Sequence, residues 1–132
     1  MIRVDIDVEA SPDLVWDILR DTGAVHTRLA PGFVTDTVLD GDSRYVTFAN
    51  GVRVRELLVT CDAAARRLAY SVQGGTAQHH HASFEARSNE RGGTKLVWTT
   101  DVYPDAAVAR LRPMIEQGTE VMRRALSHAA AR

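Results

Sequence analysis

The chain has 132 residues, 45% of them hydrophobic, which allows one domain with a core and is too short for two ordinary domains. Its formal net charge of −1 excludes the basic field that nucleic acid or an anionic membrane would require. The N-terminus alternates apolar and charged residues instead of forming a signal peptide, and no stretch is apolar enough to span a membrane. We therefore expect a single cytoplasmic domain over residues 1–132 that binds no nucleic acid.

The first elements are predicted from alternation and capping. Residues 2–8 alternate apolar and charged side chains, which is typical of a half-buried strand. Ser11 is expected to cap a short amphipathic helix that begins at Pro12 and ends at Arg20. Residues 24–32 fit neither a helical nor a strand period, so we expect a loop or a short helix there.

The middle of the chain consists of short β-rich runs separated by turn signals. These runs predict six further strands, over residues 33–39, 44–49, 52–60, 67–73, 78–88 and 94–103. Asn50-Gly51 predicts a two-residue type I′ turn, which needs positive φ at both residues.

Residues 105–130 predict a long helix, because apolar residues recur every three or four positions opposite a charged face. Pro113 is expected to mark either a kink or the start of the main helix after a short lead-in. Gly118 costs about 1 kcal/mol relative to alanine inside a helix, so we expect it to serve close packing or to leave space beneath the helix.

This order of elements predicts an α+β fold. A seven-stranded, curved antiparallel sheet would wrap around the long C-terminal helix, with a short helix following the first strand. The curvature would leave a space between sheet and helix.

The same elements, in their order and spacing, carry a family resemblance. The segments concerned are 10–16, 55–62, 67–72, the Gly74-Gly75 turn, 94–98 and the closing Tyr103-Pro104. The chain resembles the START-like (SRPBCC) superfamily, also called the helix-grip or birch-pollen-allergen-like fold. That superfamily includes polyketide cyclases/dehydrases, lipid-transfer domains and plant abscisic-acid receptors. The resemblance implies an apolar pocket between sheet and helix, but it implies no particular reaction.

Glu56 is the first candidate for a functional residue. Strand alternation places it on one face with Val54 and Leu58, so it is expected to point inward. Burial of a carboxylate is costly unless it is paired, protonated or reached by water. The related hormone receptors have a pocket glutamate at the matching position, so Glu56 would be a general base or a polar anchor. The alternative is an edge glutamate that faces solvent or pairs with Arg53 or Arg55.

The run His79-His80-His81 is divided by the same alternation. His80 is expected to face inward with Ala82 and Phe84, while His79 and His81 share the solvent face. If the strands stack as in the family, Glu56 would orient His80 as a catalytic base; the alternative is a hydrogen-bonded core histidine. A metal site needs three or four converging ligands and this run supplies two, so we predict no metal. The sequence has neither a Walker loop nor a dinucleotide-binding fingerprint, and we predict no cofactor.

The facing of the last strand stays open at this point. Hydrophobicity turns Trp98 inward, whereas alignment on the closing proline with the hormone receptors turns Asp101 inward. With Asp101 inside, His80 and Glu56 would complete a dehydratase-like acid/base set. With Trp98 inside, the pocket would be more apolar and would suit passive binding of an aromatic ligand.

The other expected ligand contacts come from several elements. Arg28 lies in the segment that often forms a pocket wall or gate in this family, where it would hold a ligand carboxylate or phenolate. The alternative is ordinary exposed loop charge. The remaining contacts are expected from Val54, Leu58, Ala82, Phe84, Trp98, Met114, Gly118 and Met122.

Three functions are consistent with this sequence. The first is a carrier or sensor that binds a hydrophobic small molecule (a polyketide, an aromatic compound or a lipid), with Glu56 and His80 as polar anchors. The second is a polyketide cyclase, aromatase or dehydratase that uses His80 with Glu56 or Asp101 as acid and base. The third is a partner-binding module with a vestigial pocket. Ligand identity and the formation of a homodimer are left open.

Overall fold

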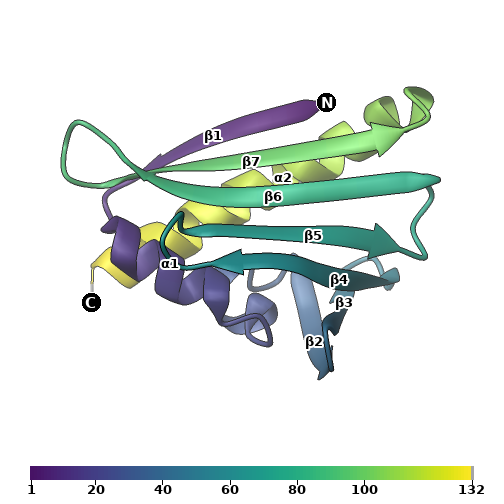
Figure 1. Cartoon of the computed structure of the whole chain (residues 1–132), viewed down its shortest axis with the longest axis horizontal. Coiled ribbons are helices and arrows are strands. Elements are labelled where there is room, and N and C mark those ends of the chain that lie inside the picture. The colour runs from purple at the N-terminus through teal and green to yellow at the C-terminus, as the bar shows by residue number, and fades with distance from the viewer. Residues whose placement is uncertain (132) are drawn as a thin grey trace.

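The computed structural model describes residues 1–131, which form one antiparallel sheet, two α-helices and a π-helical turn between the first helix and the second strand. The strands lie in the order β1-β7-β6-β5-β4-β3-β2, so only β1 pairs with a strand distant in sequence. The sheet curves along one side of α2 (Figure 1), and the predicted helix-grip fold is confirmed. The elements are β1 (Ile2–Val8), α1 (Pro12–Arg20), η1 (Val25–Leu29), β2 (Val34–Asp40), β3 (Ser43–Phe48), β4 (Arg53–Asp62), β5 (Arg67–Gln73), β6 (His79–Ser88), β7 (Thr94–Tyr103) and α2 (Ala106–Ala130).

Helix α1 begins and ends where the sequence predicts. The Ser11 hydroxyl accepts a hydrogen bond from the backbone N–H of Leu14, which satisfies a donor that the first helical turn leaves unpaired. Helix α2 is continuous from Ala106 to Ala130 with Pro113 inside it. Pro113 therefore does not mark a late start of the helix.

The β3–β4 turn differs from its prediction. Gly51 has a φ of +88°, but Asn50 is not among the residues with positive φ. The Gly51 N–H donates to the Phe48 carbonyl at 2.9 Å, and the Phe48 N–H donates to the Val52 carbonyl at 2.8 Å. This pattern is a three-residue hairpin loop with glycine in the left-handed position, so the two-residue type I′ assignment was wrong.

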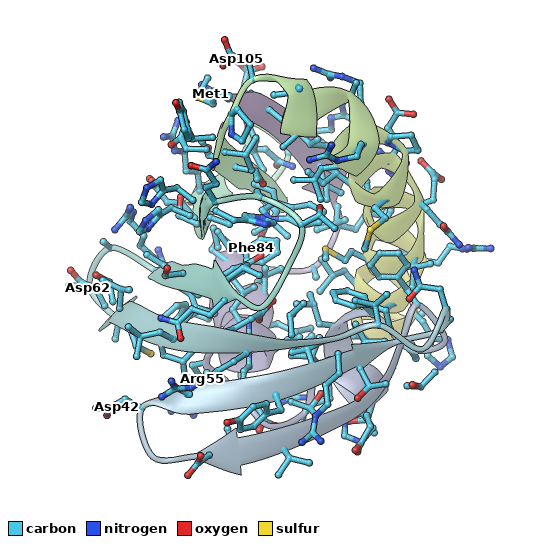
Figure 2. All side chains as sticks on the ribbon, turned by 90° about the vertical axis from the view of Figure 1, so that its right-hand side faces the viewer. Met1, Asp42, Arg55, Asp62, Phe84 and Asp105 are labelled. Carbon is cyan, nitrogen blue, oxygen red and sulfur yellow. The ribbon has the colours of Figure 1, made fainter. Side chains whose placement is uncertain are left out.

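The core lies between the concave face of the sheet and the helices. Side chains from both layers meet there (Figure 2), and those of Ile6, Leu19, Leu96 and Leu126 are almost completely buried. The Thr94 hydroxyl donates to the Ala10 carbonyl at 2.7 Å and fixes the chain between β1 and α1 against β7. Among the described residues, no helix is long and apolar enough to span a membrane.

Candidate functional site: the cavity between sheet and helix

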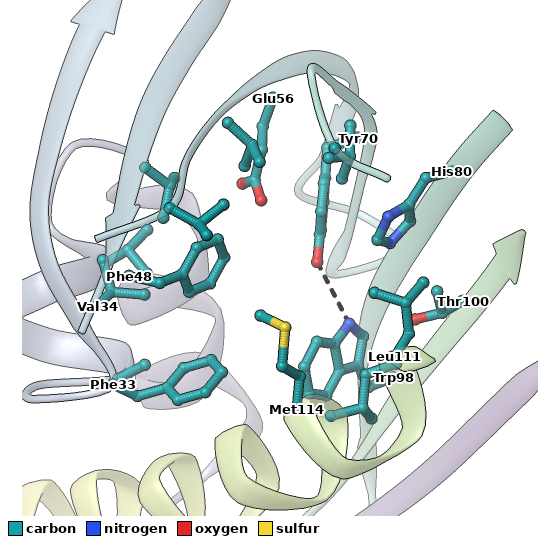
Figure 3. Close-up of a pocket in the computed structure, with 18 of the residues that line it drawn as sticks. Phe33, Val34, Phe48, Glu56, Tyr70, His80, Trp98, Thr100, Leu111 and Met114 are labelled. Carbon is teal, nitrogen blue, oxygen red and sulfur yellow. Dashed lines mark hydrogen bonds between the residues drawn. The ribbon is translucent and has the colours of Figure 1, made fainter. Parts of the chain in front are cut away.

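A cavity of about 390 Å³ lies between the concave face of the sheet and α2 (Figure 3). This volume falls in the range of small-molecule pockets, about 300–1,000 Å³. Its walls are mainly apolar: Val25, Leu29, Ala30, Phe33, Val34, Val46, Phe48, Val52, Val54, Val72, Phe84, Trp98, Leu111, Met114, Ile115 and Met122. The polar side chains that line it are Arg44, Asn50, Glu56, Tyr70, Thr76, His80, Thr100 and Arg110.

Glu56 faces the cavity but is paired. Arg44 lies directly opposite it on β3, and Arg44 Nε donates to Glu56 Oε1 at 2.7 Å. Both side chains are buried, with 3% and 9% of their surface exposed. The partner is thus neither of the arginines considered from the sequence, because Arg53 and Arg55 point to the outer face. Since Arg44 neutralises the carboxylate, Glu56 is not a free base.

Three aromatic rings form one wall of the cavity. Phe84 stacks on Trp98 with ring centroids 5.1 Å apart and on Tyr70 at 6.1 Å. Trp98 Nε1 donates to the Tyr70 hydroxyl at 3.3 Å, and the Arg44 guanidinium lies 5.3 Å from the centre of the Tyr70 ring. Burial, reinforced by the negative charge of Glu56, raises the pKa of Tyr70, so the phenol stays protonated.

His80 also lines the cavity, yet it does not meet Glu56. Glu56 pairs with Val72 of β5, and the neighbouring Ser71 pairs with His81 of β6, so strand β5 lies between the two candidates. Two interstrand spacings amount to about 10 Å. The expected carboxylate-oriented histidine is therefore not formed. Burial, with a smaller contribution from His81, lowers the pKa of His80, so its ring is neutral at pH 7.

Strand β7 turns Trp98 and Thr100 toward the cavity and Asp101 away from it. Asp101 is exposed on the outer face, directly opposite His81. The alignment that placed Asp101 inside was wrong, because alternation cannot bury both Trp98 and Asp101 on the same face. His79 is exposed as well, and the described residues hold no group of three His, Cys, Asp or Glu that could bind a metal.

The sequence matches the family described as polyketide cyclase / dehydrase and lipid transport over residues 1–132. The chain belongs to this family. Among proteins with curated descriptions, none matches it significantly.

Solved structures place the chain in the same fold. A Thermobifida fusca protein is 26% identical, with a TM-score of 0.78 over 96% of this chain and 89% of its own. The Zhui aromatase/cyclase from Streptomyces sp. R1128 is 21% identical, with a TM-score of 0.74 over 99% and 93%. A START superfamily protein from Mycobacterium smegmatis is 10% identical, with a TM-score of 0.72 over 98% and 96%. At such low identity, the last two likenesses show the fold alone.

The segment before β2 forms part of the cavity wall, as the family resemblance implies, but Arg28 does not take part. Val25, Leu29 and Ala30 line the cavity, while the Arg28 guanidinium binds Asp17 at 2.9 Å and Asp21 at 3.0 Å. Hydrogen bonds to these two carboxylates raise the pKa of Arg28. Arg28 therefore ties η1 to the end of α1, and its expected role as a ligand contact was wrong.

The other expected contacts divide into two groups. Val54, Phe84, Trp98, Met114 and Met122 line the cavity. Leu58, Ala82 and Gly118 do not: Leu58 adjoins a β-bulge, Ala82 is short and buried among its neighbours, and Gly118 is covered by Phe33.

Gly118 allows Phe33 to approach α2. A Cβ atom at this position would lie 3.1 Å from Cε2 of the Phe33 ring, closer than ordinary van der Waals contact. Close packing is therefore the reason for this glycine, and the Phe33 ring that covers it lines the cavity.

Arg44, Tyr70 and Thr100 are among the polar cavity residues that sequence reasoning missed. Alternation along β3 puts Arg44 on one face with Val46 and Phe48. This pattern alone would have predicted that Arg44 points inward and could pair with Glu56. Tyr70 and Thr100 face Ala82 from either side in the paired strands. That juxtaposition requires the strand register, which the sequence did not provide.

Proposed function

We propose that this protein binds a hydrophobic or aromatic small molecule in the cavity, as a carrier or sensor. The observation that carries the proposal is a cavity of about 390 Å³ whose walls are mainly aliphatic and aromatic. Each Å² of apolar ligand surface transferred from water to such walls contributes roughly 25 cal/mol. Polyketides, other aromatic compounds and lipids all offer such surface, and the family description includes lipid transport.

The charged groups favour binding over catalysis. The enzyme hypothesis requires at least two polar groups that reach one point, with His80 assisted by Glu56 or Asp101. Glu56 is held by Arg44, and Asp101 lies on the outer face. Neither carboxylate therefore assists His80, and a cyclase or dehydratase would need a different set of groups.

The proposal is tested first by native mass spectrometry of the purified protein, which detects a retained ligand. Binding is then measured with N-phenyl-1-naphthylamine, an uncharged dye whose fluorescence rises in apolar surroundings. Met114→Trp places a large ring in the cavity from α2, and Glu116→Trp places the same ring on the exposed face of that helix.

We expect Met114→Trp to weaken dye binding at least about tenfold, because a side chain then occupies the ligand volume. Glu116→Trp should bind as the parent protein does. Equal binding by both variants would place the dye elsewhere on the molecule and would contradict the proposal.

A further inference from the structure

The hydroxyl group of Tyr70 has an unused donor. An indole N–H donates only, so the hydrogen bond from Trp98 Nε1 occupies a lone pair of the Tyr70 oxygen and leaves the O–H proton free. Within residues 1–131 this proton has no acceptor. Because Tyr70 is 94% buried, judged from its exposed fraction of 6%, and lines the cavity, only a group inside the cavity can accept the proton.

A second hydroxyl lies on the same side of the cavity. Tyr70 pairs with Ala82, and Ala82 pairs with Thr100, so the three residues form one row across β5, β6 and β7. Thr100 is 1% exposed, lines the cavity and makes no side-chain hydrogen bond within the described part of the chain. The small Ala82 side chain separates the two hydroxyl-bearing residues in this row, and Figure 3 draws both among the residues that line the cavity.

The surroundings of these hydroxyls determine which acceptor they fit. Phe84, Trp98 and Met114 are apolar neighbours, and the Arg44 guanidinium lies against the Tyr70 ring, held by Glu56. Because Glu56 already neutralises Arg44, a carboxylate placed beside Tyr70 would find no unpaired cation on the sheet and would be buried among apolar side chains, which is costly. A neutral oxygen acceptor has no such penalty.

We propose that the cavity selects apolar ligands that carry a neutral carbonyl oxygen, such as a ketone, quinone or ester, with that oxygen bound by the Tyr70 hydroxyl. The inference rests on the proposed function and names its ligand class. A site built to donate a hydrogen bond rejects an analogue that lacks the acceptor, because the donor is then left unpaired.

The test uses two probes that differ only at one ring carbon, 9-fluorenone with a carbonyl and fluorene with a CH₂ group, on the parent protein and on Tyr70→Phe. The parent should bind fluorenone about three- to tenfold more tightly than fluorene, after correction for their different solubilities in water. Tyr70→Phe should remove this preference. Tyr45→Phe is the matched control, because Tyr45 lies on the outer face against Arg53, and it should keep the preference.

Infrared spectroscopy supplies a readout that does not depend on stability. The carbonyl stretch of bound fluorenone should lie at lower frequency in the parent than in Tyr70→Phe, since a donated hydrogen bond weakens the C=O bond.

The outcomes separate the two proposals. If the parent binds both probes equally and the carbonyl stretch is that of a ketone without a hydrogen bond, the carbonyl inference is wrong while ligand binding stands. This result is expected if the Tyr70 hydroxyl donates to a water molecule in the cavity. If neither probe binds, the proposed function and the inference both fail.

Discussion

The two faces of the sheet carry similar residues in opposite physical settings. On β6, His80 faces the cavity and its pKa is lowered by burial, while its neighbours His79 and His81 are exposed. On β7, Trp98 is buried and Asp101 is exposed. Three consecutive histidines thus contribute one candidate ligand contact, because the strand alternates its side chains between the two faces.

The same contrast holds for ion pairs. Arg44–Glu56 on the inner face and Arg87–Glu85 on the outer face have similar N–O distances, 2.7 and 2.9 Å. Their exposure differs: the inner side chains are 3% and 9% exposed, and the outer ones 49% and 33%. Distance alone therefore does not determine the contribution of a pair, because burial sets the cost of leaving one partner uncompensated.

Breaking these two ion pairs should give the largest difference in unfolding free energy between the two faces of the sheet. Glu56→Gln leaves the buried Arg44 charge uncompensated, and we expect the free energy of unfolding to fall by about 3–5 kcal/mol. Glu85→Gln should lower it by less than about 1 kcal/mol. Urea unfolding at pH 7 measures both. Small and equal losses would mean that water reaches the inner pair.

A larger side chain at Ala82, between Tyr70 and Thr100, should have the next largest effect on stability. Ala82→Leu adds bulk between Tyr70 and Thr100, with an expected cost of about 1–3 kcal/mol from overpacking. Ser83→Leu adds the same side chain on the opposite face and should stay within about 0.5 kcal/mol. Thermal unfolding measures the cost, and a loss of fluorenone binding confined to Ala82→Leu would place the ligand at this row.

His80 should make the stability of the protein depend on pH. Because the pKa of His80 is below 6.5 in the folded protein, the unfolded chain binds a proton more readily, and stability falls as the pH drops below 6.5. The loss grows until the pH reaches the folded pKa of His80 and then levels off. His80→Gln should remove this component, as shown by comparing unfolding free energies from pH 7 to pH 4.5.

NMR titration of the His80 ring gives the same pKa directly. His81→Gln should raise it only in part, since burial is the larger cause and the charge of His81 the smaller one. A His80 pKa at or above 6.5 in the parent would show that the ring is solvated.

The smallest effect on ligand affinity is expected from a substitution at Asp101. Asp101→Asn changes an exposed carboxylate on the outer face, so affinity for a cavity ligand should stay within about twofold. Calorimetric titration with fluorenone measures it. A tenfold loss would return Asp101 to the candidate site.

Local patterns in the sequence were sufficient to predict most of the fold. Alternation and turn residues locate all seven strands to within two residues, and Ser11 with Pro12 defines the start of α1. The Asn50-Gly51 turn was misjudged because an Asn-Gly pair also suits a three-residue loop, in which only the glycine is left-handed.

The candidate site was harder to predict because it depends on which strands are neighbours. Alternation indicated the inward faces of Glu56 and His80, but β5 lies between them, so facing inward did not bring them together. Arg28 illustrates the limit for irregular segments. Its partners, Asp17 and Asp21, are close only because η1 folds back against α1, which neither helical nor strand periodicity encodes.

The most direct test of ligand binding in the cavity is an NMR titration with 9-fluorenone that follows the two indole N–H signals and the Met114 methyl signal. Trp98 and Met114 line the cavity, whereas Trp16 is buried on α1 outside it. Ligand binding in the cavity predicts saturable shifts of the Trp98 and Met114 signals with Trp16 unchanged. Equal movement of both indoles, or shifts confined to the exposed rings of His79 and His81, would contradict it.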